Sequence, residues 1–110
     1  MATALKVLGQ SAPLAATLTT LYTVPASTEV STSSIVVCNR SSVATSFRVA
    51  IRPAGAGISD EHYIYYDVPI PGNDTFIATI GISLEATDVV SVYATLATLS
   101  FNYYGQEITA

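Results

Sequence analysis

The segment from Ser34 to Pro53, SIVVCNRSSVATSFRVAIRP, constrains the fold of this chain most strongly. It begins with a continuous apolar and mainly β-branched run at 35–38, which is typical of a strand covered on both faces. After a polar break comes strict alternation over 47–52, the pattern of a half-buried strand. Because the connection is short and rich in Ser and Asn, we expect the two strands to pair antiparallel. Pro53 ends the second strand, since it lacks the N–H that a ladder needs.

Further short strands are predicted on both sides of this pair, separated by turns that contain Pro, Gly and Asn. They cover 19–24, 62–68, 75–80, 88–93 and 96–104, with a weaker strand or crossing loop at 81–87. The last two are alternatively one long strand with a bulge near Ala94, because Ala-Thr is poor turn chemistry. With seven or eight short strands and no helical segment, the chain is predicted to be all-β, an antiparallel β-sandwich or jelly roll.

The length of 110 residues fits one domain with a core of its own. Residues 1–18 are predicted to form an extended N-terminal arm or a first edge strand near Leu5 to Leu8. Residues 19–104 form the β-sandwich domain, and residues 105–110 a C-terminal tail. The polar residues after Leu8 interrupt any apolar signal segment, so we interpret the start as mature structure.

The composition favours self-association. Only 11% of the residues are charged, whereas a free surface usually carries roughly a quarter or more of charged side chains. Part of the outside is therefore expected to lie against other subunits. A net charge of −4 and only four Lys and Arg residues argue against nucleic acid and anionic lipid as partners. No stretch reaches the ~20 apolar residues of a membrane span.

No group of residues has the spacing of a catalytic or zinc site. Cys38 and His62 are the only residues of their kinds, and Cys38 is predicted to be a small buried hydrophobe. We therefore predict a protein that is not an enzyme and holds no cofactor or metal. Two alternatives involve acidic residues at turns and strand ends: a weak metal site shared between subunits around His62, and a carboxylate pair for glycoside chemistry. The residues concerned are Asp60, Glu61 and Asp67 for the metal, and Asp74, Glu85, Asp88 and Glu107 for the pair.

The tyrosine-rich strand HYIYYDV at 62–68 is predicted to lie at a subunit contact. Alternation places Tyr63, Tyr65 and Asp67 on one face and Ile64, Tyr66 and Val68 on the other. A tyrosine buries an apolar body and keeps a hydroxyl for a hydrogen bond, which suits an interface. Stacking of sugar rings on exposed tyrosines is the alternative. The tyrosines considered for it are Tyr63, Tyr65, Tyr103 and Tyr104.

Five phrases, taken in order, resemble a group of small structural proteins of tailed bacteriophages over nearly the whole chain. They are LGQSAPLAATLTTLYTVPAST, SSIVVCNRSS, FRVAIRPAG, HYIYYDVPIPGNDTF and TDVVSVYATLATLSFN. The resemblance implies a β-sandwich component of the virion that is repeated many times in the particle. No functional residue is carried over from it.

From the resemblance and the composition we expect a capsid decoration or cement protein on the virion surface. Its expected partners are the major capsid protein and copies of itself, as a dimer or trimer. The expected contact residues are Leu5, Val7, Leu8, Tyr63, Tyr65 and Tyr104. A neck, tail or fibre component is the first alternative, and a carbohydrate-binding module for host attachment is the second.

Overall fold

A computed structural model describes residues 2–109 and confirms the all-β fold. Nine strands lie in two antiparallel sheets, and two short 3₁₀ turns, η1 (Pro53–Gly55) and η2 (Asp60–His62), lie between β4 and β5. The strands are β1 (Ala2–Ser11), β2 (Thr19–Thr23), β3 (Thr28–Asn39), β4 (Thr45–Arg52), β5 (Tyr63–Ile70), β6 (Thr75–Ala78), β7 (Ser83–Leu84), β8 (Val89–Ala94) and β9 (Leu99–Thr109).

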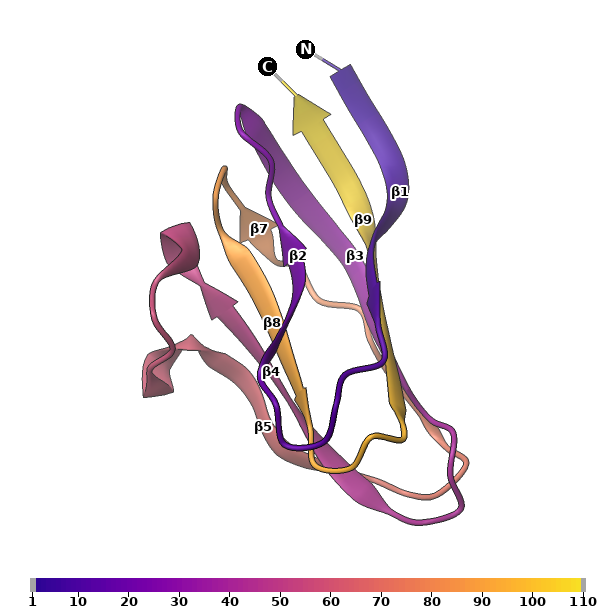
Figure 1. The fold of residues 1–110 in the computed structure, drawn as a ribbon. Coiled ribbons are helices and arrows are strands. Elements are labelled where there is room, and N and C mark those ends of the chain that lie inside the picture. The colour runs from indigo at the N-terminus through magenta and orange to yellow at the C-terminus, as the bar shows by residue number, and fades with distance from the viewer. Residues whose placement is uncertain (1, 110) are drawn as a thin grey trace.

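The strand order identifies the sandwich as a jelly roll. One sheet runs β1-β9-β3-β6, with β7 also paired to β3, and the other runs β2-β8-β4-β5 (Figure 1). We call them the β9 sheet and the β4 sheet. The pairs β1–β9, β2–β8, β3–β6 and β4–β5 are all antiparallel. The first half of the chain therefore folds back along the second half as one long hairpin, which rolls into two layers.

The core lies between the sheets, and aromatic rings from both sheets pack together in it. Phe47 of the β4 sheet is fully buried. Its ring centroid lies 5.1 Å from that of Phe76 and 6.1 Å from that of Phe101, both in the β9 sheet. Val90 and Val92 of β8, and Leu99, Phe101 and Tyr103 of β9, are buried between the sheets.

The predicted pairing of the two central strands is wrong. β3 and β4 lie in different sheets, because β3 is already flanked by β6 and β9. The side chain of Asn39 holds the crossing loop. Its Nδ2 donates to the carbonyl oxygens of Val43 (2.9 Å) and Pro71 (3.2 Å), and its Oδ1 accepts from the Ser41 N–H (3.1 Å). These bonds turn the chain out of the β9 sheet instead of into a hairpin.

Two segment predictions are corrected at the other end of the chain. Residues 105–109 are not a tail, because they continue β9 and pair with β1 on one side and β3 on the other, so that Thr109 lies opposite Ala2. Ala110 lies outside the described residues. β8 and β9 are separate strands joined by a turn over 95–98, and no bulge links them. The weaker strand predicted at 81–87 is the two-residue β7.

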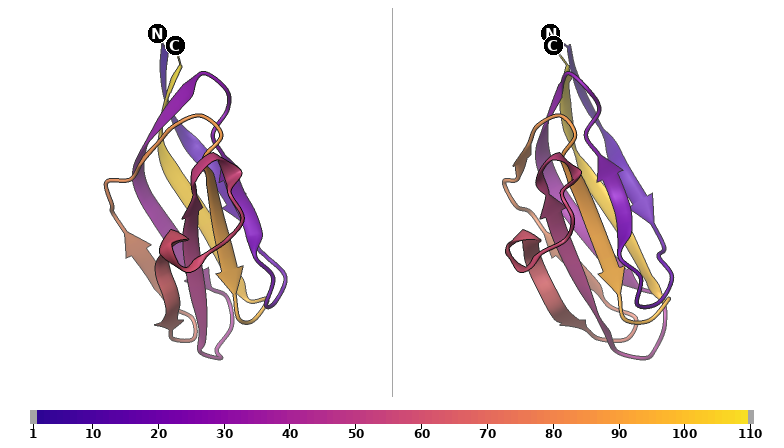
Figure 2. Two further views of the ribbon diagram at one scale, coloured as in Figure 1. Left: turned by 90° about the vertical axis from the view of Figure 1, so that its left-hand side faces the viewer. Right: turned by 60° about the vertical axis from the view of Figure 1, so that its left-hand side comes forward.

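β1 is the edge strand of the β9 sheet, and its first half projects from the sandwich. The side chains from Ala2 to Val7 are all exposed, whereas Leu8 is buried. Ala2 of β1 and Thr109 of β9 lie opposite each other at a tapered end of the molecule (Figure 2). At Gly9 the strand comes so close to β2 that an added Cβ would lie 2.3 Å from the carbonyl oxygen of Leu21. The first half of β1 therefore pairs with β9 alone, whereas its second half also packs against β2.

Candidate interaction surfaces

The outer face of the β9 sheet carries no charged side chain along its central rows. Because Phe101 and Tyr103 point into the core, their neighbours on β9 point outward. The strand register then lines up Val7, Tyr104 and Ser34 in one row. We call this surface the uncharged face. It consists of Leu5, Val7, Gln10, Ser31, Ser34, Val36, Cys38, Thr75, Ile77, Ser100, Asn102, Tyr104 and Gln106.

Three aliphatic side chains stand out of the uncharged face. Leu5 is 82% exposed, Ile77 65% and Val7 47%, while Val36 and Cys38 are half-buried beside them. The run at 35–38 is therefore covered on its inner side only, which corrects the expectation that both faces are covered and that Cys38 is buried. Isolated exposed apolar residues are ordinary, but several on one flat face without charges mark a contact surface.

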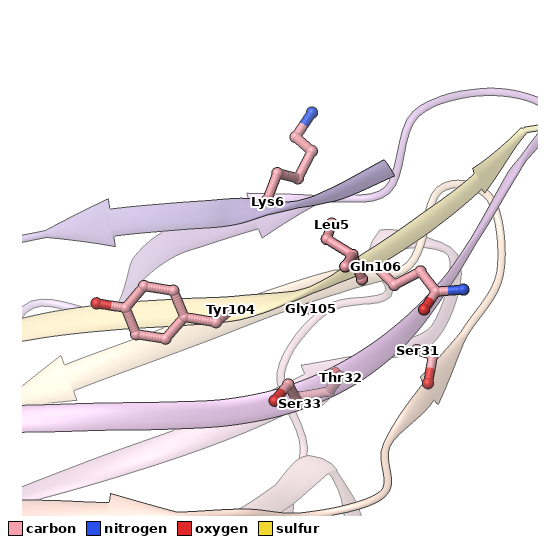
Figure 3. A pocket seen from close by; sticks show the side chains of 8 residues that line it. All are labelled: Leu5, Lys6, Ser31, Thr32, Ser33, Tyr104, Gly105 and Gln106. Carbon is pink, nitrogen blue, oxygen red and sulfur yellow. The ribbon is translucent and has the colours of Figure 1, made fainter. Parts of the chain in front are cut away.

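A groove of about 470 Å³ crosses this face where the β3 register shifts between Thr32 and Ser34. Figure 3 shows its lining, which comes from β1, β3 and β9. The ammonium group of Lys6 points away from the sheet in this view, and an ion pair with Glu107 holds it (2.9 Å). The lining that faces the groove consists of hydroxyl, amide and apolar groups, so the groove suits an uncharged partner segment.

The structure brings together three of the six expected contact residues, namely Leu5, Val7 and Tyr104 on the uncharged face. Leu8 is corrected, because its side chain points to the opposite face from Val7 and lies in the core. Tyr65 is also corrected: it packs against the core, with its ring centroid 5.3 Å from that of Phe76. Leu8 is therefore not available to a partner, and Tyr65 is half-buried and offers only part of its ring.

Tyr63, the sixth expected contact residue, lies on the β4 sheet, where it joins a cluster that the sequence analysis did not predict. The Arg48 guanidinium lies between the rings of Tyr66 and Tyr93, 4.2 and 4.4 Å from their centroids. Asp67 accepts from Arg48 Nε (2.6 Å) and Nη2 (3.4 Å), and this bond raises the pKa of the guanidinium further. Tyr63 packs edge-on against Tyr66, 4.9 Å between centroids.

Tyr66 is the exposed tyrosine of this cluster, at 57%. The predicted alternation is wrong on both sides of the pair Tyr65 and Tyr66. A register shift between Val49 and Ala50 puts Tyr63 and Tyr65 on opposite faces, and Asp67, with a φ of 51°, puts Val68 on the face of Tyr65. Tyr63, Tyr66 and Asp60 line a second hollow of about 410 Å³. The hollow offers aromatic rings and a carboxylate, a combination that can receive a sugar.

Two of the four carboxylates considered for glycoside chemistry, Asp74 and Asp88, form hydrogen bonds within loops. Asp88 accepts from the backbone N–H groups of Ala54 and Glu85, both at 2.9 Å. Asp74 accepts from the N–H of Thr75 (2.8 Å). Each carboxylate thus stabilises a turn, and the structure offers no argument for the carboxylate pair.

Glu107 joins the two sheets at the open end of the sandwich. Its Oε2 accepts from the Tyr22 hydroxyl of the β4 sheet (2.5 Å), and its Oε1 accepts from Lys6 (2.9 Å). The hydrogen bond from Tyr22 lowers the pKa of Glu107 most, and the bond from Lys6 lowers it further. Burial and then the same carboxylate raise the pKa of Tyr22. The carboxylate therefore stays ionised and acts as a structural link.

Within residues 2–109, no three or more His, Cys, Asp and Glu side chains lie close enough together to hold a metal ion. His62 Nδ1 instead accepts from the Ser59 N–H at the start of η2 (3.1 Å). None of the described helical turns is long and apolar enough to cross a membrane.

The candidate surfaces are thus the uncharged face and the tyrosine hollow on opposite sheets. Compared with models of protein families, with curated proteins and with solved structures, the chain matches none.

Proposed function

We propose that the chain is a non-enzymatic structural protein of a bacteriophage virion. It acts as a decoration or cement protein that bridges neighbouring subunits of the major capsid protein on the capsid surface. The observation that carries this proposal is the uncharged face, with Leu5, Val7 and Ile77 exposed on the outer side of the β9 sheet. The resemblance to small structural proteins of tailed phages supports it.

The uncharged face has the chemistry of a docking surface. Full burial of an aliphatic side chain contributes roughly 1.5–3 kcal/mol. The exposed parts of the three residues together equal about two side chains, so they offer about 3–6 kcal/mol before costs. Association costs at least about 4 kcal/mol in lost freedom. One copy therefore binds weakly, and a lattice of many copies is needed for a lasting coat. Binding only to the assembled shell stabilises that shell by mass action.

The jelly roll is compatible with this role. The architecture occurs in viral capsid domains, and it also occurs in lectins and cupins. A fold shared by several functions does not choose between them. The choice rests on the surface, where a face without charges matches a contact with a protein better than a contact with water or phosphate.

The experiment compares two matched isoleucine variants for binding to heads of the phage that encodes the chain. Ile77→Asp places a charge on the uncharged face, and Ile64→Asp places the same charge on β5 of the opposite sheet, where Ile64 is 42% exposed. We expect wild type and Ile64→Asp to cosediment with heads that lack the protein and to raise the temperature at which these heads release DNA. Ile77→Asp should do neither.

Two results would contradict the decoration role. Heads that neither bind the protein nor gain heat resistance rule out cementing. Particles that lack the protein, keep heat-resistant heads and lose their tails instead support a neck, tail or fibre component.

A carbohydrate-binding module is the second candidate, and the hollow beside Tyr66 favours it. An exposed tyrosine ring with a carboxylate nearby can stack on a sugar while the carboxylate accepts from its hydroxyl groups. The test is a glycan array with wild type and Tyr66→Ala. Binding that Tyr66→Ala abolishes and Ile77→Asp preserves supports this candidate. An array without any bound glycan counts against it.

A further inference from the structure

β1 is the least protected sheet edge among the described strands. A free edge offers unpaired N–H and C=O groups, and proteins usually guard it with prolines, bulges or short length. At the edge of the β4 sheet, β5 contains Pro69 and the left-handed Asp67. β2 is five residues long and irregular, and β6 and β7 have four and two residues. β1 has ten residues and no proline.

The first half of β1 is regular as well as exposed. From Ala2 to Val7 it pairs with β9 without a register shift, and all six side chains are exposed. The shift comes only at Leu8, where the strand turns into the core. A second strand can therefore extend the β9 sheet at this edge without displacing a described element (Figures 1 and 2).

Two copies of β1 can pair with little charge repulsion between them. Lys6 is the one charged residue of β1, and Glu107 neutralises it at 2.9 Å. Glu107 carries its ion pair on the inner side of the sheet, since it also bonds to Tyr22 of the β4 sheet. The outer side of the edge holds Thr3, Leu5 and Val7 and is free of charge.

We propose that two copies of the chain join through β1, antiparallel about a two-fold axis, to form one continuous sheet. In a continuous sheet, two residues that lie opposite each other point to the same side. The two-fold axis must therefore pass through a residue and not between two residues, and the candidates are Ala4, Leu5 and Lys6. An axis at Lys6 sets two like charges opposite each other, which is destabilising. An axis at Leu5 sets Leu5 of one copy, which is 82% exposed, against Leu5 of the other copy, and it sets Thr3 opposite Val7. We infer the Leu5-centred register.

The dimer is expected to be weak in dilute solution. The regular part of β1 ends at Val7, so a ladder centred on Leu5 runs from Thr3 to Val7. Five residues are about 17 Å long, and with a layer thickness of about 10 Å the ladder covers about 170 Å² per copy. Stable complexes cover about 800 Å² per partner. Association is therefore expected at high concentration, and on a repeating surface where neighbours are held close together. This inference does not depend on the virion role, because its tests use the purified chain alone.

Disulfide trapping tests the register. Cys38 lies on the same face, so every variant also carries Cys38→Ser. Strand pairs opposite one another have Cα separations of about 4.5–5.5 Å, within the range of a disulfide. Leu5→Cys should therefore form a covalent dimer under mild oxidation. Thr3→Cys and Val7→Cys should each fail alone and cross-link when mixed. Equal cross-linking of Leu5→Cys and Val7→Cys alone would overturn the register.

Sedimentation over a concentration series tests the edge. Leu5→Lys sets two like charges at the axis, and we expect it to weaken self-association by at least about tenfold. Ile77→Lys is the matched control, because Ile77 lies on the same face but on β6 at the opposite edge. It should associate as wild type does. A wild-type protein that stays monomeric near millimolar concentration overturns the proposal, and so does a loss of association in Ile77→Lys alone.

Discussion

Truncation of Phe47 tests whether the two sheets share the aromatic core described above. Phe47 is fully buried, and its ring meets Phe76 and Phe101 of the facing sheet and Tyr65 of its own. Phe→Ala in a core costs about 3–5 kcal/mol, including the cavity. The entropy of unfolding for a chain of this length is about 0.23 kcal/mol/K, so a loss of about 4 kcal/mol lowers Tm by about 17 °C.

Urea unfolding followed by far-UV circular dichroism measures the loss, since the chain has no tryptophan to report by fluorescence. Tyr66→Ala is the control. Its ring is 57% exposed and contacts Arg48, so it should cost no more than about 1 kcal/mol. If Phe47→Ala costs less than about 1.5 kcal/mol, the ring does not bridge the sheets and the packing argument is refuted.

Three further changes have defined outcomes. Gly9→Ala pushes a methyl group against the Leu21 carbonyl and should cost about 1–3 kcal/mol, whereas Gly81→Ala, with open space around it, should be neutral in the same thermal melts. Because folding lowers the pKa of Glu107, the stability that this carboxylate contributes is complete above its unfolded pKa near 4.3 and is lost as pH falls through the lower folded pKa. Glu107→Gln should therefore flatten the dependence of stability on pH below about pH 5. An unchanged dependence would contradict the ion-pair assignment. Arg48→Lys removes the planar stack on an exposed face, so the unfolding midpoint should shift by the equivalent of less than about 1 kcal/mol; a larger loss would show that this cluster is a structural centre.

The strands themselves are predictable from the sequence, because alternation reports which side chains are buried. Sheet membership is not. The hydrogen bonds of Asn39 decide that the chain crosses to the other sheet, and a polar loop of Ser and Asn is equally typical of a hairpin. The segment from Gly105 onward has no apolar alternation. It is a strand because its neighbours on both sides pair with it.

The candidate surface was predictable only in part. Leu5 and Val7 have the alternation of an edge strand, and the same alternation turns Leu8 inward. The bulge after Val7, by contrast, lies where β1 contacts β2 and has no mark in the sequence. Val68 was assigned to the same face as Tyr66, but the left-handed residue between them, Asp67, reverses the parity of the strand after it, so Val68 points inward. A non-glycine residue in that conformation leaves no strong mark in the sequence.

The long rolled hairpin has a consequence for synthesis. Asn39 on β3 lies opposite Leu99 on β9, so the early strands wait for partners made much later. At ribosomal rates of about 5–20 residues per second, this delay is about 3–12 s, whereas a local hairpin closes in microseconds. During those seconds the nascent chain displays unpaired β-strands to its neighbours on the same polysome. Nascent chains on one polysome therefore meet one another before their long-range strand pairs have formed.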